Sequence, residues 1–117
     1  MAKYENLIVW QKSMQLVEEI YKLSNFFPKE EVYGLISQIK RSVISIPSNI
    51  AEGRGRSSKK EFINFLYFSL GSLYELKTQI EIAKRLNFKG DYKQVDNLIF
   101  EIERMLHSLI NNKKGLN

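Results

Sequence analysis

Apolar side chains recur every three or four residues along most of this chain. Between residues 32 and 50 they follow one another at steps of four, three, four, three and four: Val32, Ile36, Ile39, Val43, Ile46 and Ile50. Residues at this spacing share one face of an α-helix, whereas a half-buried strand alternates at every second residue. Only two of the 117 residues are proline and six are glycine, so few positions interrupt long helices. The pattern predicts an all-α chain and excludes a loop-rich β fold.

Helix-start and helix-stop signals divide this pattern into four segments. Asn6 is the expected N-cap of the first helix, and Pro28 suits the first turn of the second. Ser58 followed by Glu61 is a capping box that opens the third helix, and Gly90 lies beyond its end. The expected helices cover residues 7–24, 29–53, 58–86 and 91–111. Because the connections are short, we expect an antiparallel, up-down-up-down four-helix bundle, a single domain over residues 1–117.

Pro47 lies in the middle of the second expected helix. Proline has no N–H, so it removes the hydrogen bond to the Val43 carbonyl and disturbs the preceding turn. The apolar spacing nevertheless keeps its phase on both sides of Pro47. We therefore expect one helix that is kinked at Pro47 and runs to about Gly53. Two shorter helices, broken near residues 45–48, are the alternative.

The third expected helix carries more apolar surface than a single bundle buries. Besides its main stripe, it has a second and the beginning of a third, formed by Ile63, Tyr67, Leu70, Tyr74, Phe65 and Phe68. A helix that is apolar on all sides is buried on all sides. We therefore expect these six residues to form the contact between copies of the chain in a homo-oligomer. Coverage of this helix by a loop, or by Phe26 and Phe27, is the alternative.

Positive charge is concentrated in one quarter of the chain. The net charge is +5, and residues 31–60 hold six basic and two acidic side chains. Such a cluster attracts polyanions more strongly than the same charge spread evenly. The expected phosphate contacts are Arg54, Arg56, Lys59 and Lys60, with Lys40 and Arg41 as auxiliaries. A solvated connection that is basic for solubility alone is the alternative.

Small polar residues also recur at helical spacing in the second and third helices. A buried hydrogen-bonded network of Asn49, Glu52, Glu75 and Gln79 is expected to fix the register between these helices. A carboxylate pair of Glu52 and Glu75 is the catalytic alternative.

Other chemistry has little support in the sequence. There is no cysteine, and His107 is the single histidine, so thiolate zinc sites and His-based catalytic or metal sites lack their residues. A di-iron bundle needs Glu-x-x-His, but position 104 is arginine. We expect no cofactor, no metal and no catalytic residue. No apolar run is long enough for a signal core or a membrane span, so we expect a cytoplasmic chain without membrane association.

Several strings resemble a known family. They are Val9-Trp10-Gln11, Tyr33-Gly34-Leu35, Ser45-Ile46-Pro47-Ser48-Asn49-Ile50-Ala51-Glu52-Gly53 and Gly71-Ser72-Leu73-Tyr74-Glu75-Leu76. Over about residues 5–110 the chain resembles the bacterial four-helix-bundle proteins encoded in intervening sequences of 23S ribosomal RNA genes. It is also similar to the accessory variability determinant of diversity-generating retroelements. This resemblance implies a pentameric ring without enzymatic activity that associates with nucleic acid, and the retroelement relatives bind a reverse transcriptase.

Three functional hypotheses follow. The first is a non-catalytic homo-oligomer that binds RNA or other nucleic acid through the cluster from Arg54 to Lys60. The second is a protein-interaction scaffold, or an accessory subunit for a nucleic-acid enzyme such as a reverse transcriptase. The third is a small-molecule enzyme that uses Glu52 and Glu75.

Overall fold

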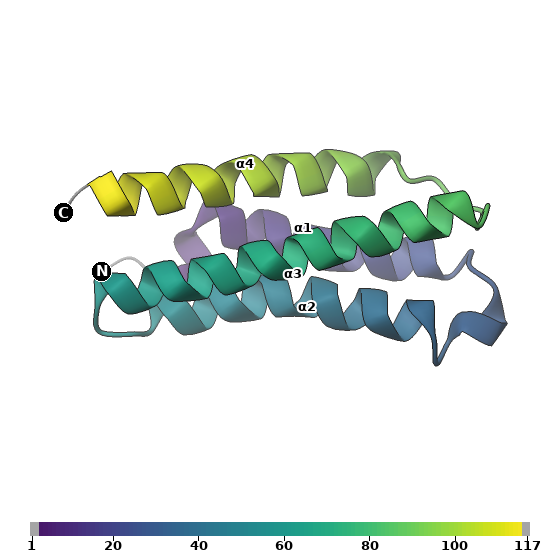
Figure 1. Cartoon of the computed structure of the whole chain (residues 1–117), viewed down its shortest axis with the longest axis horizontal. Helices are drawn as coiled ribbons and strands as arrows, with labels where there is room; N and C mark the ends of the chain where they lie inside the picture. The colour runs from purple at the N-terminus through teal and green to yellow at the C-terminus, as the bar shows by residue number, and fades with distance from the viewer. Residues whose placement is uncertain (1–2, 116–117) are drawn as a thin grey trace.

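The structure of the chain, a computed structural model, describes residues 3–115. Four helices lie along the long axis of a bundle that measures 47 × 21 × 20 Å (Figure 1). They are α1 (Ile8–Ser24), α2 (Leu35–Arg54), α3 (Lys59–Arg85) and α4 (Lys93–Gly115). Each helix packs on its neighbours in sequence, and α1 also packs on α4, so that α1 and α3 lie diagonally opposite. The expected four-helix bundle is confirmed, and no strand occurs among the described residues.

The second helix begins later than its pattern predicts. Residues Lys29–Glu31 form the 3₁₀ helix η2 after Pro28, and α2 begins only at Leu35. Gly34 has φ −112° and ψ −114°, a non-helical conformation that separates η2 from α2. The Glu31 carboxylate then accepts a hydrogen bond from the Leu35 N–H at 3.1 Å and so satisfies one free donor of the first turn. The predicted start at residue 29 is therefore wrong.

The two outer ends also differ from their predictions. Asn6 lies in a short 3₁₀ helix, η1 (Tyr4–Asn6), and the residue that precedes α1 is Leu7, which has no side-chain cap. The last helix continues to Gly115, beyond the predicted end at residue 111. This extension adds a turn that carries Lys113 and Lys114.

The helix α2 runs without interruption through Pro47, so the alternative of two shorter helices is wrong. The Ser69 hydroxyl donates to the Ile46 carbonyl at 2.8 Å, next to the proline, and ties α3 to α2 there. The bend at Pro47 stays a prediction.

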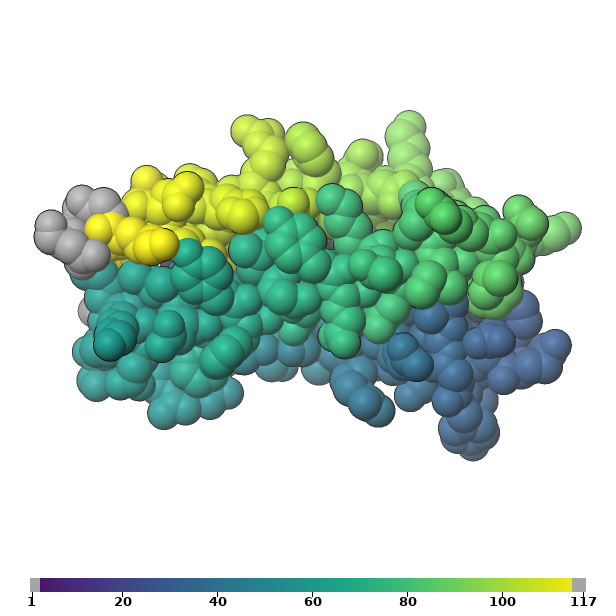
Figure 2. Space-filling view, in the orientation of Figure 1, coloured from purple at the N-terminus to yellow at the C-terminus, as the bar shows by residue number. Residues whose placement is uncertain are grey.

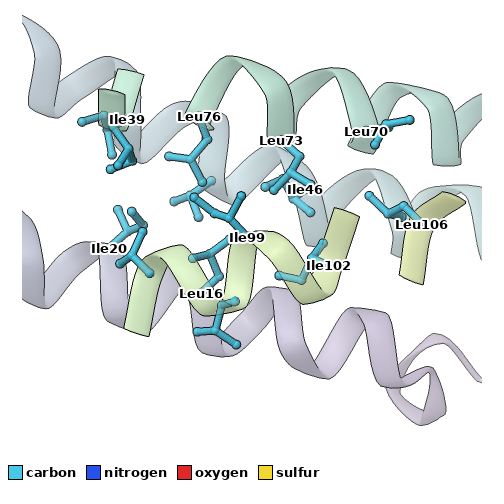
Figure 3. Packing of buried hydrophobic residues seen from close by; sticks show 14 of the residues in the cluster. Leu16, Ile20, Ile39, Ile46, Leu70, Leu73, Leu76, Ile99, Ile102 and Leu106 are labelled. Carbon is cyan, nitrogen blue, oxygen red and sulfur yellow. The ribbon is translucent and has the colours of Figure 1, made fainter. Parts of the chain in front are cut away.

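The core lies along the bundle axis, where apolar side chains of all four helices meet (Figure 3). In α2 and α3 the buried residues follow the predicted stripes. In the first helix the apolar spacing predicts a buried stripe of Leu7, Trp10, Met14, Val17 and Tyr21. The buried stripe of α1 is instead the neighbouring one through Ser13 and Leu16, and Met14 and Tyr21 are exposed. The Ser13 hydroxyl donates to the Val9 carbonyl at 2.6 Å, so this serine is buried without an unsatisfied group. A prediction of buried positions from apolar residues alone does not include a buried serine such as Ser13.

Gly53 sets how closely α2 approaches α3. A Cβ atom at this position would lie 2.5 Å from the Phe65 Cβ, which is well inside van der Waals contact. We predict that Gly53→Ala lowers the free energy of unfolding by about 1–3 kcal/mol, because the two helices must separate to admit the methyl group. Urea denaturation of the purified variant measures this loss. Gly55→Ala is the matched control, since its nearest atom would lie 3.5 Å away, and equal effects at both positions would contradict the packing argument.

Candidate nucleic-acid interface

The predicted basic cluster lies at the end of the bundle where α2 passes into α3. Arg54 is the last residue of α2, and Lys59 and Lys60 open α3. Ser58 caps α3 by accepting the Glu61 N–H at 3.1 Å, which confirms the predicted N-cap. Because the connection spans only residues 55–58, all the charges of the cluster stay at one end of the molecule.

Aromatic rings of α3 hold the two arginines. The Arg54 guanidinium carbon lies 5.4 Å from the centre of the Phe62 ring, and that of Arg56 lies 5.0 Å from the centre of the Phe65 ring. Arg56 also pairs with Glu52 at 2.7 Å. Cation–π contacts of this kind orient a guanidinium against the ring.

The end of α4 adds two lysines that the sequence analysis missed. The Lys113 ammonium lies 5.9 Å from the centre of the Phe62 ring, and that of Lys114 donates to the Tyr67 hydroxyl at 3.0 Å. In Figure 2 the last turn of α4, in yellow, lies against the beginning of α3, in teal. The signal was available, because an antiparallel bundle places the end of its fourth helix beside the start of its third. We call the six residues together the basic end: Arg54, Arg56, Lys59, Lys60, Lys113 and Lys114.

Lys40 and Arg41 do not join the basic end. Lys40 lies in the first half of α2, and its ammonium is 4.5 Å from the centre of the Tyr21 ring of α1. Fourteen residues of α2 separate it from Arg54, which corresponds to roughly 20 Å along the helix. Their role as auxiliary phosphate contacts stays a prediction.

The polar contacts between α2 and α3 differ in part from the predicted network. Gln79 is buried and accepts a hydrogen bond from the Ser42 hydroxyl at 2.8 Å. Asn49 is half-buried and donates to the Ser45 hydroxyl at 2.9 Å, and Ser45 in turn bonds Ser72 at 2.8 Å. The hydroxyl groups of Ser42, Ser45 and Ser72 thus make most of these polar contacts, together with the amides of Gln79 and Asn49.

Glu52 and Glu75 are both exposed, so their predicted place in a buried network is wrong. The two carboxylates are also far apart. Gly53 lies against Phe65, so Glu52 faces a part of α3 ten residues before Glu75, or roughly 15 Å along the helix. A catalytic carboxylate pair needs its two side chains close together, so Glu52 and Glu75 do not form one.

The six residues predicted to form the contact between copies divide into two groups. Tyr67, Phe68 and Tyr74 are exposed, with 44%, 57% and 41% of their surface accessible. Leu70 is buried in the core (Figure 3), so its assignment to a surface contact is wrong. Ile63 and Phe65 are half-buried, and their place in such a contact stays a prediction. We call Tyr67, Phe68 and Tyr74 the aromatic face of α3.

Neither Phe26 nor Phe27 lies on this aromatic face. Phe27 packs instead on Phe88 and Tyr92, with ring centres 5.4 and 6.1 Å away. Phe26 lies near Gly90 at the end of the bundle opposite the basic end and is 66% exposed. The alternative in which these two phenylalanines cover the third helix is therefore wrong.

A polar cluster joins α3 to α4 beside the aromatic face. The Tyr74 hydroxyl donates to Glu103 at 3.0 Å and lies 3.0 Å from His107 Nε2, and Lys77 donates to Glu103 at 3.1 Å. The hydrogen bond to Glu103, with a smaller contribution from burial, raises the pKa of Tyr74. Burial pushes the pKa of Glu103 upward, but the hydrogen bonds from Lys77 and Tyr74 outweigh it and hold this pKa below its usual value. His107 is thus part of a polar contact between two helices.

Neither a metal site nor a membrane span is present in the described part of the chain. Among residues 3–115 no three histidine, cysteine or acidic side chains gather closely enough to hold a metal ion. Over the same residues, no helix combines the length and the apolar character needed to cross a bilayer.

The fold and its charged end define a class of protein, a small all-α bundle with one basic end. Residues 5–108 match the family described as 23S rRNA-intervening sequence protein, and the chain belongs to this family. It is also similar to the crystal structure of a protein of unknown function from the S23 ribosomal protein family of Bacteroides thetaiotaomicron. The TM-score is 0.80 and the identity 29%, over 88% of this chain and 98% of that one. A comparison with curated proteins finds no match.

Proposed function

We propose that this protein is a non-catalytic, homo-oligomeric bundle that binds RNA or another nucleic acid through its basic end. The observation that carries the proposal is the convergence of six cations, from the end of α2, the start of α3 and the end of α4, on one end of the bundle. Phosphate contacts supply most of the affinity for nucleic acid where base-reading groups are few. The family description refers to 23S rRNA, which makes RNA the first ligand to test. The proposal includes a cytoplasmic location for the protein, where it would encounter RNA.

Self-association is the second part of the proposal, and Gly71 supports it. This glycine lies inside α3, next to the aromatic face, and a Cβ atom there would meet nothing within 4 Å. Glycine in a helix interior costs about 1 kcal/mol relative to alanine, and no contact within the protomer accounts for that cost. A second copy whose backbone approaches closely at Gly71 would account for it. A ring of five copies, as the family resemblance implies, would repeat the basic end and raise avidity.

A salt titration tests the binding. If each of the six cations neutralises one phosphate, affinity falls roughly 10³-fold between about 50 mM and 200 mM salt. Fluorescence anisotropy with labelled single-stranded and duplex RNA and DNA measures this slope. Affinity that does not change with salt, or no detectable binding to any of the four ligands, would contradict the proposal.

A protein scaffold, or an accessory subunit of a nucleic-acid enzyme such as a reverse transcriptase, is the second candidate. The exposed aromatic face favours it, because exposed aromatic side chains are typical of protein contacts. Native mass measurement before and after nuclease treatment separates the two functions. A complex that loses its bound partner on nuclease treatment supports nucleic-acid binding, and one that keeps a protein client supports the scaffold.

A further inference from the structure

A second exposed apolar surface lies where α1 packs on α2. Met14 and Tyr21 are two turns apart on one side of α1, and both are exposed. The Lys40 ammonium of α2 lies 4.5 Å from the centre of the Tyr21 ring. Ile44 follows Lys40 by one turn of α2, so it lies on the same side of the molecule, and it is exposed as well. We call Met14, Tyr21 and Ile44 the α1–α2 face.

The α1–α2 face and the aromatic face of α3 lie on different sides of the bundle, because α1 and α3 are diagonally opposite. A dimer with twofold symmetry uses the same surface of both copies, so it would cover one of these faces and leave the other in solvent. A head-to-tail contact joins two unlike surfaces and therefore needs one of each on every copy. The protomer has such a pair.

Each face has beside it a charge that no partner within the protomer accounts for, and the two charges are opposite. Glu75 lies one turn after Gly71 on α3, and Arg41 lies one turn before Ile44 on α2. Both are exposed, and neither side chain forms a hydrogen bond or an ion pair with the described residues 3–115. Complementary charges of this kind orient two surfaces as they meet.

We propose that the aromatic face of one copy packs on the α1–α2 face of the next, with Glu75 of the first beside Arg41 of the second. The inference rests on the self-association proposed above and names the surface that receives the aromatic face. Gly71 lines an open hollow together with Phe68 and Tyr74, and a side chain that enters it meets the α3 backbone. Ile44, which projects from α2 beside Arg41, supplies such a side chain.

Two variants that each block one face test the head-to-tail arrangement. Gly71→Arg blocks the aromatic face, and Ile44→Arg blocks the α1–α2 face. We expect each variant alone to sediment as a monomer. An equimolar mixture should form heterodimers of twice the protomer mass, because each variant keeps the face that the other lacks.

Gln15→Arg is the matched control on α1. Gln15 lies one turn after Lys12, which pairs with Glu101 of α4, so it lies on the α4 side of Met14 and outside the α1–α2 face. This variant should assemble as the wild type does. Circular dichroism checks that all three variants keep their helices.

Reversal of the two charges tests the orientation. Glu75→Arg and Arg41→Glu should each weaken assembly about tenfold, because each places like charges side by side in the contact. The double variant restores opposite charges, so it should recover most of the wild-type affinity. A loss that persists in the double variant overturns the pairing of Glu75 with Arg41.

The remaining results separate this inference from the self-association on which it rests. If Ile44→Arg keeps the wild-type mass, the α1–α2 face does not receive the aromatic face, and self-association itself stands. A mixture of the two blocked variants that stays monomeric overturns the head-to-tail arrangement. A wild type that is already a monomer overturns the proposed self-association, and this inference with it.

Discussion

Replacing Arg54, Arg56, Lys59 and Lys60 by glutamate together is expected to abolish nucleic-acid binding while the bundle keeps its fold. The loss should be about 10³-fold or more at moderate salt, because four attractive phosphate contacts become repulsive ones. Anisotropy titrations with the RNA that the wild type binds measure the loss. Native mass measurement in the same buffer shows whether assembly persists, which we expect because the aromatic face lies further along α3.

The same four substitutions have small and partly opposing effects on the fold. Lys59 and Lys60 lie in the first turn of α3, where a negative side chain is favoured by the helix dipole. At the end of α2 the sign is reversed, and Arg56→Glu would face Glu52 one turn earlier, at a cost of about 0.2–0.5 kcal/mol. Far-ultraviolet circular dichroism and a thermal melt check that the variant is folded.

A charge-matched variant at the other end of the bundle separates local charge from total charge. Lys22, Lys29, Lys89 and Lys93 are exposed and lie near the end opposite the basic end. Replacing these four by glutamate gives the same net charge, yet we expect most of the affinity to remain. Equal losses in the two variants would mean that binding follows net charge alone, and the basic end would lose its assignment.

The packing of α2 on α3 was predictable from the sequence because most of its buried residues are apolar and follow a helical spacing. The core positions of α1 were not, since Ser13 lies on the buried stripe and its hydroxyl bonds the helix's own backbone. The start of α2 was not predictable from the apolar spacing either, and Gly34 is the reason. The pattern continues through the segment before it, but the backbone of this glycine ends the 3₁₀ helix and delays α2 to Leu35.

The candidate site was predicted only for the part that is continuous in sequence. Arg54 to Lys60 form a visible cluster, whereas Lys113 and Lys114 join it through the antiparallel course of α4. The excess apolar surface of α3 was recognised, but periodicity alone does not show which residues stay exposed. Both α2 and α4 pack on α3, and Leu70 is buried, whereas Tyr67, Phe68 and Tyr74 stay exposed.

Replacing Gly71 by arginine is expected to convert the proposed homo-oligomer into monomers of 13.8 kDa without unfolding the protomer. The space next to Gly71 is open within one copy, so the long side chain is accommodated in the protomer, and leaving glycine should raise its stability by up to about 1 kcal/mol. In the assembly the arginine would occupy the place of the neighbouring copy. Assembly and protomer stability should therefore change in opposite directions, which a merely destabilising substitution does not produce.

Sedimentation velocity and native mass spectrometry measure the assembly, and urea denaturation measures the stability. Gln15→Arg is the matched control, since it places the same side chain at an exposed position of α1, away from the aromatic face. We expect this control to assemble as the wild type does. If Gly71→Arg keeps the wild-type mass, the contact lies elsewhere. If the wild type itself is a monomer, a neighbouring copy no longer accounts for Gly71 and the aromatic face. The proposed gain in avidity from repeated basic ends is then also wrong.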